Sequence, residues 1–442
     1  MSLWDMAGQS EFHAFHDCMF PDIGTNSYQL PSMFMFIWSP IDSESSEKGA
    51  LKNDKSFEAS FRYWLRFLAS KSKQSNITLK VMVVFTRANQ MATLSHAFST
   101  RIDSLRSDFK GVIHISDPPF HVDARKKDSM RDVATHIFDI AKHMLGGIQV
   151  YKIYTYVNKL LSKHLKNTNE GIITWETFRK ICPTNDKAKL EAIALCLNES
   201  GNIIYINGIR HIILNPNWFC NEVMGSLIYF SNSKANKSTI PLDDGCTPRD
   251  TLEECLQSVV KSKVKGSLLV DLMEAMHLCC KVAINNGVPD SPVDHIFIPT
   301  LFTDGGVEKL HWRLSATHNV DDDTFVYMGR RLECEDKDLT FLTPRLFPRV
   351  QVLFNKAFQS LQKEYKPHVM LGKDFISICF PNKEIIVVFC QAKSEHVIDV
   401  LVRANNQNNG QQYHTLTTLV DIQAYYRYLG HDMRTTNRHP RG

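Results

Sequence analysis

The residue types best suited to chemistry gather in the first twelve positions of the chain, which read MSLWDMAGQSEF. Leu3 and Trp4 have the character of a strand end, and Asp5 to Gln9 follows as a turn into a polar helix. A carboxylate such as Asp5 can hold the shell of a magnesium ion, the amide of Gly8 can approach a phosphate, and Gln9 can orient an attacking water. This order of residues is typical of phosphoryl transfer from a nucleoside triphosphate.

The loop that cradles the phosphates in such sites is not encoded in this sequence. P-loop nucleotide hydrolases carry Gly-x-x-x-x-Gly-Lys-Ser/Thr ahead of the magnesium-binding strand, and this pattern occurs nowhere in the 442 residues. We therefore expect a nucleotide-binding domain that begins after its phosphate loop, with no catalysis left in this chain. Residual GTP binding and slow hydrolysis are the alternative, which a fluorescent GTP titration with magnesium distinguishes.

Composition indicates a globular protein from a reducing compartment. Hydrophobic residues make up 43% of the chain and charged residues 22%, and the net charge of +4 is too small to make nucleic acid the main partner. The 11 cysteines are scattered, so neither a disulfide framework nor a zinc site is expected, and Asp5 is the sole candidate metal ligand, for magnesium. No apolar run approaches the ~18 residues of a membrane span. We expect a cytoplasmic protein without a transmembrane segment, and peripheral association with the plasma membrane stays open.

Strands alternate with helices in the first third of the chain, which is typical of a parallel α/β sheet. Residues 32–39 and 79–85 are continuous apolar runs that predict strands buried on both faces, and residues 120–123 predict a short third strand. Helical spacing of apolar residues predicts helices over 57–68, 91–105 and 129–145. Gly146-Gly147 is a plausible domain boundary.

The next segment has a winged-helix pattern. It comprises predicted helices over 150–166, 174–178 and 188–198, and predicted strands over 203–206 and 211–214. Asn207-Gly208 between the two strands is a strong hairpin signal. A winged helix can bind DNA, so a nucleic-acid binder is a further alternative. The presumed recognition helix has no basic stripe, because Lys187 and Lys189 are balanced by neighbouring acidic residues, and we expect a packing module that does not bind DNA.

The remaining sequence predicts a mixed α/β region. Helices are expected over 248–261, 266–285, 344–361 and 416–428. Strands are expected over 295–299, 310–314, 324–332, 375–379, 385–389 and 397–401. The polar, basic end of the chain is expected to be disordered.

Several motifs, taken in order, resemble the Roco family, in which a Ras-like Roc domain is followed by a COR domain. Residues 4–12 resemble the Roc signature Trp-Asp-x-Ala-Gly-Gln-x-Glu-Phe/Tyr, and residues 214–219 are similar to the COR element Leu-x-Pro-x-Trp-Leu. Residues 297–299 and 342–350 look like later COR motifs. Residues 16–21 and 63–67 are most similar to plant members that carry leucine-rich repeats ahead of Roc.

The resemblance implies an α/β protein with an incomplete Ras-like parallel sheet, followed by a COR domain with a winged-helix half and a mixed α/β half. The implied boundaries are 1–147 for the partial Roc domain, 148–232 and 233–432 for the two COR halves, and 433–442 for a disordered tail.

The resemblance also implies which residues correspond to the nucleotide-binding site of the family. In this chain they are expected to be vestiges of that site. The residues expected to contact nucleotide or magnesium in the family are Asp5, Gly8, Gln9, Thr86, Asn89, Asp123 and Ala124. Asn89 departs from the family pattern, which has an aspartate that accepts two hydrogen bonds from guanine, whereas an amide accepts with one end only. The resemblance therefore implies weakened base recognition.

Five COR residues are expected to form a core, with a Roc–COR contact as the alternative: Trp175, Phe178, Pro216, Trp218 and Phe219. In the family, COR mediates dimerisation and couples nucleotide state to partners. The sequence therefore predicts a homodimeric scaffold module with protein partners and no cofactor of its own. The resemblance implies that the full-length parent binds GTP and Mg²⁺ and acts in plant developmental patterning.

Overall fold

The computed structural model describes most of the chain. The described residues are 32–41, 52–72, 78–87, 95–146, 151–206, 209–227, 246–259, 264–283, 294–301, 325–334, 336–344, 346–365, 368–380, 385–392, 397–405 and 433–438. The contacts divide the chain into two compact units. The α/β unit contains residues 21–155 and the short segment 336–341, and the second unit, which we call the COR unit after the predicted resemblance, contains residues 1–20, 156–335 and 342–442. The predicted domain boundaries stay predictions.

The α/β unit is built on a parallel sheet, as predicted. Its strands are β1 (Met33–Trp38), β2 (Leu79–Thr86), β3 (Ile113–Ile115) and β4 (Phe120–Val122). β2 is central, because β1 pairs along its whole length while β3 and β4 pair with its beginning and its end. The sequence analysis missed β3, since three residues are too few to show a pattern.

Helices α2 (Asp54–Ser72) and α3 (Ser95–Asp108) cover one face of this sheet. Successive strand residues point to opposite faces, so Phe36 and Trp38 of β1 lie on the same face. Phe57 of α2 lies within 6.0 Å of both rings, and Phe98 of α3 lies 5.2 Å from Trp38. An aromatic core thus fixes both helices on this face.

The opposite face is covered less completely by α4 (Lys127–Leu145). Val133 of α4 packs with Met82 and Val84 of the sheet. On the same face Ile37 is 57% exposed, and Phe138 of α4 is 67% exposed. Parallel sheets are normally buried on both faces, and among the described residues α4 is the element that packs on this one.

The COR unit begins with the predicted winged helix. Its elements are α5 (Lys152–Thr168), β5 (Ile172–Thr174), α6 (Trp175–Ile181), α7 (Lys187–Glu199), β6 (Ile204–Tyr205) and β7 (His211–Ile213). The strands pair in the order β5-β7-β6, and the hairpin turn at 207–208 lies outside the described residues. Thr174 and Asp186 cap α6 and α7, and Gly201 follows α7 with a φ of 68°.

A second group of elements shares a core with the winged helix. It contains α8 (Pro216–Trp218), the π-helix η3 (Phe219–Met224), β8 (Cys246–Pro248), α10 (Arg249–Val259), α11 (Gly266–Ala275), β9 (Cys280–Ala283), β10 (Asp294–Phe297) and the 3-10 helix η4 (Pro299–Leu301). The helix predicted over 266–285 is wrong beyond Ala275. His277 adopts a left-handed φ of 56°, which ends the helix, and residues 280–283 pair with β10.

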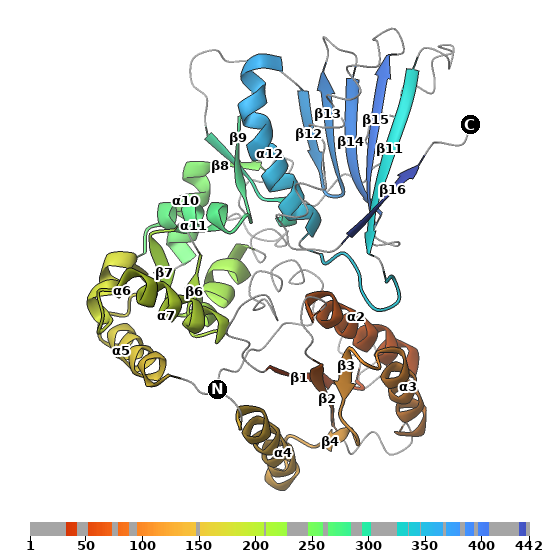
Figure 1. The fold of residues 1–442 in the computed structure, drawn as a ribbon, viewed down its shortest axis with the longest axis vertical. Coiled ribbons are helices and arrows are strands. Elements are labelled where there is room, and N and C mark those ends of the chain that lie inside the picture. The colour runs from red at the N-terminus through yellow and green to blue at the C-terminus, as the bar shows by residue number, and fades with distance from the viewer. Residues whose placement is uncertain are drawn as a thin grey trace. The chain divides into compact units, whose positions relative to one another are not determined.

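The last part of the COR unit is an antiparallel sheet with one helix against it (Figure 1). Its elements are β11 (Phe325–Cys334), α12 (Leu346–Tyr365), β12 (His368–Gly372), β13 (Phe375–Phe380), β14 (Ile385–Ala392), β15 (Val397–Asn405) and β16 (Met433–Arg438). The sheet order is β12-β13-β14-β15-β11-β16, and Phe347 and Val350 of α12 join its core.

Two expectations change here. Residues 433–438 of the tail predicted to be disordered form β16, because the free edge of β11 offers backbone groups to pair with, and residues 439–442 lie outside the described residues. The sequence also missed β12. The strand predicted over 310–314 and the helix predicted over 416–428 lie outside the described residues.

Within the described part of the chain, no helix has both the length and the apolar character to cross a bilayer.

Candidate functional site

The carboxyl edge of the parallel sheet holds those predicted nucleotide-site residues that the structure describes. Trp38 pairs with Phe85, and Thr86 pairs with Val122, so β1, β2 and β4 end side by side. The Thr86 hydroxyl donates to the Trp38 carbonyl at 3.3 Å, and Asp123 follows Val122 directly. In open α/β sheets ligands bind at the carboxyl ends of the strands. The structure therefore brings Thr86 and Asp123 to the edge where a ligand would bind.

The backbone leaves β2 in an unusual conformation. Arg87, directly after Thr86, has a φ of 56°. Such a positive φ is uncommon for residues other than glycine. Such conformations cluster at functional and tightly turned positions. Asn89, two residues further, lies outside the described residues, as do Asp5, Gly8 and Gln9. Their assigned roles therefore stay predictions.

The carboxylate of Asp123 forms an ion pair with Arg125, two residues later in the chain. Its side chain is almost buried, and both carboxylate oxygens accept hydrogen bonds of 2.9 Å from the Arg125 guanidinium. The Arg125 backbone amide donates to the same carboxylate at 3.2 Å, and the Asp123 amide donates to the Ser129 hydroxyl at 3.0 Å. The guanidinium hydrogen bonds lower the pKa of Asp123 to about 2. Asp123 thus anchors the turn that exposes Ala124.

This pKa predicts a pH dependence of stability. Because the pKa falls from 3.8 to about 2 on folding, the ion pair stabilises the fold above pH 3.8. The contribution is lost as the pH falls through the window between these values. Chemical unfolding of the wild type and of Asp123→Asn between pH 2 and pH 5, a range set by the two pKa values, measures it. We expect a shallower loss of unfolding free energy for the variant, and parallel curves would contradict the assignment.

A second site, which the sequence analysis did not predict, lies on α2. Tyr63, Arg66 and Ser70 form what we call the α2 docking face, and they receive the segment Asp336–Phe341 from more than 260 positions later in the chain. Arg66 Nη2 donates to the carbonyls of Lys337 and Thr340 at 2.7 and 2.8 Å. Both hydrogen bonds are charge-assisted, which makes them stronger than neutral ones.

Phe341 completes this contact. Its buried ring lies 5.3 Å from the ring of Tyr63, and the Arg66 guanidinium carbon lies 5.1 Å from its centroid. Its backbone amide donates to the Ser70 hydroxyl at 3.1 Å, and the Phe341 carbonyl lies 3.1 Å from the same oxygen. The contact therefore combines charge-assisted hydrogen bonds from Arg66, the packing of the Phe341 ring and hydrogen bonds between Ser70 and the Phe341 backbone.

The segment forms a turn that is held by its own hydrogen bonds. The Asp336 carboxylate accepts a hydrogen bond of 3.0 Å from the Leu339 amide, and the Asp336 carbonyl accepts one of 2.9 Å from the Thr340 amide. The Thr340 hydroxyl donates to the same carbonyl at 2.6 Å. In this turn the carbonyls of Lys337 and Thr340 both face Arg66, which donates to each of them.

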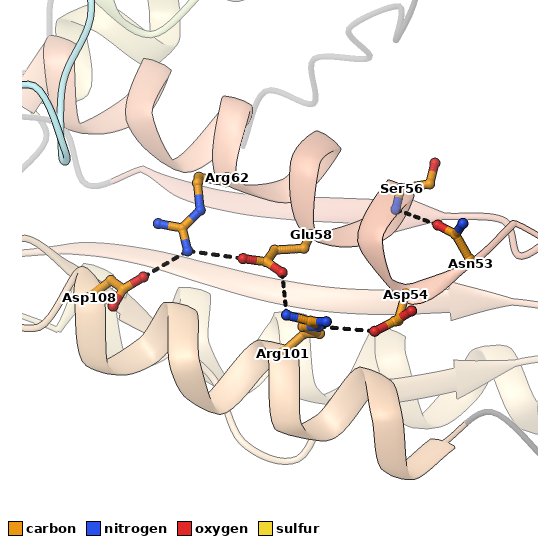
Figure 2. Close-up of polar contacts among 7 residues, drawn as sticks. All are labelled: Asn53, Asp54, Ser56, Glu58, Arg62, Arg101 and Asp108. Atoms are coloured by element: carbon orange, nitrogen blue, oxygen red, sulfur yellow. Dashed lines mark hydrogen bonds and ion pairs between the residues drawn. The ribbon is translucent and has the colours of Figure 1, made fainter.

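A ladder of ion pairs holds α2 against α3 (Figure 2). Arg101 of α3 contacts Asp54 at 3.0 Å and Glu58 at 2.9 Å. Arg62 contacts Glu58 at 3.1 Å and reaches Asp108 of α3 at 2.8 Å. Alternating charges along both helices fix the register of α2, and with it the position of the docking face.

The five predicted COR aromatic and proline positions are packed. Phe178, Pro216 and Phe219 are buried. Trp175 stacks on Tyr205 at 5.3 Å. Trp218 lies so close to Gly171 that a Cβ there would be 3.0 Å from its ring.

The presumed recognition helix α7 carries balanced charge. Lys187 lies 4.0 Å from Glu191, and Lys189 lies 3.8 Å from Asp186. Leu195 on the same helix is 40% exposed. Paired lysines and an exposed leucine are poor ligands for DNA phosphates. Over the described residues, no cluster of His, Cys, Asp and Glu could hold a metal ion.

Comparison with known proteins identifies the class. Residues 152–302 match the family model "C-terminal of Roc, COR-A domain". The chain therefore contains a COR-A domain and is similar to proteins of the Roco, or Roc–COR, family, so the predicted resemblance is confirmed. Over 412 residues it is 28% identical to Protein TORNADO 1 of Arabidopsis thaliana, an alignment that covers 86% of this chain. The chain spans 28% of the length of that relative.

A solved structure is also similar. It is titled "Structure of methanosarcina barkeri Roco2 RocCORdC bound to GDP" and shares 19% identity. The match covers 67% of this chain and 79% of that one, with a TM-score of 0.41.

Proposed function

We propose that this chain is the dimerisation and scaffold part of a Roco-type signalling protein. The full-length parent binds GTP and Mg²⁺ and acts in plant developmental patterning, as the resemblance to plant Roco proteins implies. The observation that carries the scaffold role is the docking of Asp336–Phe341 on α2. The chain leaves the COR unit after residue 335, contributes the segment 336–341 to the α/β unit and returns at residue 342, so the α/β unit is completed by a segment distant in the sequence.

The carboxyl edge supports a role without turnover for this chain. Both oxygens of Asp123 are engaged by Arg125, so Asp123 has little capacity left to bind a ligand. Residual GTP binding is the second candidate, favoured by the position of Thr86 and Ala124 at this edge. Titration of the purified chain with fluorescent GTP and Mg²⁺ separates the two. We expect no saturable binding, and magnesium-dependent binding with phosphate release would establish a GTPase instead.

The dimer is tested by light scattering coupled to size exclusion. We expect a concentration-dependent mass near twice the 50.6 kDa of one chain. A protein that stays monomeric up to the highest soluble concentration would refute the dimer and leave the docking contact to be judged separately.

Arg66→Ala tests the docking contact. The variant loses two charge-assisted hydrogen bonds and the contact with Phe341, so the free energy of unfolding of the α/β unit is expected to fall by about 2 kcal/mol. Hydrogen exchange of the Phe341 amide, which donates to Ser70, should accelerate.

Arg131→Ala is the matched control. Arg131 is an exposed arginine of the same unit, and it pairs with Asp128 at 3.1 Å. Such exposed pairs contribute little, and we expect a change below about 0.5 kcal/mol. Equal exchange of the Phe341 amide in both variants would show that Arg66 does not hold the segment.

A further inference from the structure

One exposed face of α5 carries a line of like charges. Tyr156, Lys159, Lys163 and Lys166 follow one another at helical spacing, and all four side chains are exposed. We call this set the lysine stripe. At 1.5 Å per residue its backbone positions extend over about 15 Å along the helix. A straight line of positive charge on a rigid element is a surface suited to an anionic partner.

The rotation of α5 about its axis is fixed by the other side of the helix. Val157 and Leu161 are buried there, and Asn158 Nδ2 donates to Asn202 Oδ1 at 3.0 Å. These residues lie opposite the stripe on a helix of 3.6 residues per turn. The packing of Val157 and Leu161 therefore keeps the lysines on the outward side of the winged helix.

The positive charge of the stripe has no local compensation. The 17 residues of α5 include no aspartate or glutamate. Within the described part of the chain, no ion pair involves Lys159, Lys163 or Lys166. The carboxylate nearest in sequence, Glu170, lies 3.9 Å from His164. The lysines of α7, by contrast, each have an acidic neighbour.

We propose that the lysine stripe docks this protein on an anionic phospholipid surface. Lysine has a flexible aliphatic stem and a compact charge, so its ammonium can reach lipid phosphates and carboxylates that are not held in a fixed pattern. The ring of Tyr156 is apolar with a polar end, which suits the headgroup region. A nucleic-acid surface fits less well, because α7 is charge-balanced and the chain carries a net charge of only +4.

The expected strength is that of a reversible contact. Each basic side chain near an anionic membrane increases binding about five-fold, so three lysines give about 100-fold. Two stripes on one dimer act together and bind more tightly than one. That additional gain rests on the proposed dimer, whereas the contribution of the stripe itself does not.

The test is co-sedimentation of the full chain with vesicles of phosphatidylcholine, alone or mixed with phosphatidylserine. We expect binding to the mixed vesicles only, weakened by salt. The variant Lys159→Gln/Lys163→Gln/Lys166→Gln should bind about 100-fold more weakly. Tyr156→Ser, which leaves the charge intact, should weaken binding by a smaller factor.

The matched control is Lys180→Gln/Lys187→Gln/Lys189→Gln. It removes three exposed lysines from the same winged helix and changes the net charge equally. We expect it to bind like the wild type, with circular dichroism showing that both triple variants are folded.

Each outcome decides for or against the stripe. Equal loss of binding in both triple variants would show an effect of net charge alone and refute it. Failure of the wild type to bind the mixed vesicles would also refute it, and so would binding to duplex DNA in preference to them. Light scattering of the same samples reports the dimer independently, so a monomer that still binds through the stripe would refute only the dimer.

Discussion

Phe57→Ala is expected to lower the free energy of unfolding of the α/β unit by about 3–5 kcal/mol, the range for loss of a fully buried phenylalanine. Phe57 is 0% exposed and lies at the centre of an aromatic cluster. Its ring lies 5.2–6.0 Å from those of Phe36, Trp38, Phe61, Phe85 and Phe98. Truncation would open a cavity between α2 and the sheet, where rigid rings cannot close around it.

Chemical unfolding followed by tryptophan fluorescence measures this loss, because the buried Trp38 lies 5.4 Å from Phe57. Phe138→Ala is the control, since its ring is 67% exposed in the same unit and should change stability by less than about 0.5 kcal/mol. If both variants lost the same stability, the unit would not depend on the core between α2 and the sheet. Loss of the core should also release the docked segment, because Arg66 and Ser70 are carried by the same helix as Phe57.

The parts of the fold that could be predicted are those with a long local signal. The apolar runs at 32–39 and 79–85 predicted β1 and β2, because a strand buried on both faces needs apolar residues at every position. The hairpin of the winged helix was predictable from Asn207-Gly208. β3 and β16 were not, since their pairing depends on partners distant in sequence.

The helix over 266–285 shows how tertiary context overrides a local pattern. Apolar residues continue beyond Ala275, so the sequence gives no obvious stop. The chain turns at His277, which takes the left-handed conformation that glycine more often adopts at a helix end, and the Leu278 amide donates to the Met273 carbonyl at 3.0 Å. β10 then recruits the following residues as β9. A signal for this end exists only in the folded protein.

The candidate sites differ in the same way. Thr86 and Asp123 could be brought together from sequence, because parallel strands end at one edge of their sheet. The α2 docking face could not, because Arg66 binds backbone carbonyls, which carry no side-chain identity, in a segment 271–274 positions away. The similarity of residues 63–67 to plant Roco proteins was the only hint, and it did not indicate a contact.

Gly266→Ala should produce a loss of stability in the COR unit. Gly266 opens α11 where that helix meets α10, and a Cβ added there would lie 2.1 Å from the Glu253 carbonyl oxygen. That oxygen belongs to the backbone of α10 and cannot rotate away, so the helices must separate. Separation would strain the Arg249 contacts, which join Glu253 and Asp271 at 2.6 Å each, and the 2.9 Å hydrogen bond from the Gly266 amide to Gln257.

We expect Gly266→Ala to lower the free energy of unfolding by about 3 kcal/mol, near the upper end for an overpacked core. Gly225→Ala is the matched control, because a Cβ there would meet its nearest neighbour at 3.7 Å within a helical backbone. It should be neutral or stabilising by about 0.5 kcal/mol, since alanine favours helix. Because the core between α10 and α11 is shared with Phe219 and Ile213, the loss should extend to the winged helix and appear as one cooperative transition. Two separated transitions would show instead that the winged helix and the α10–α11 pair fold independently.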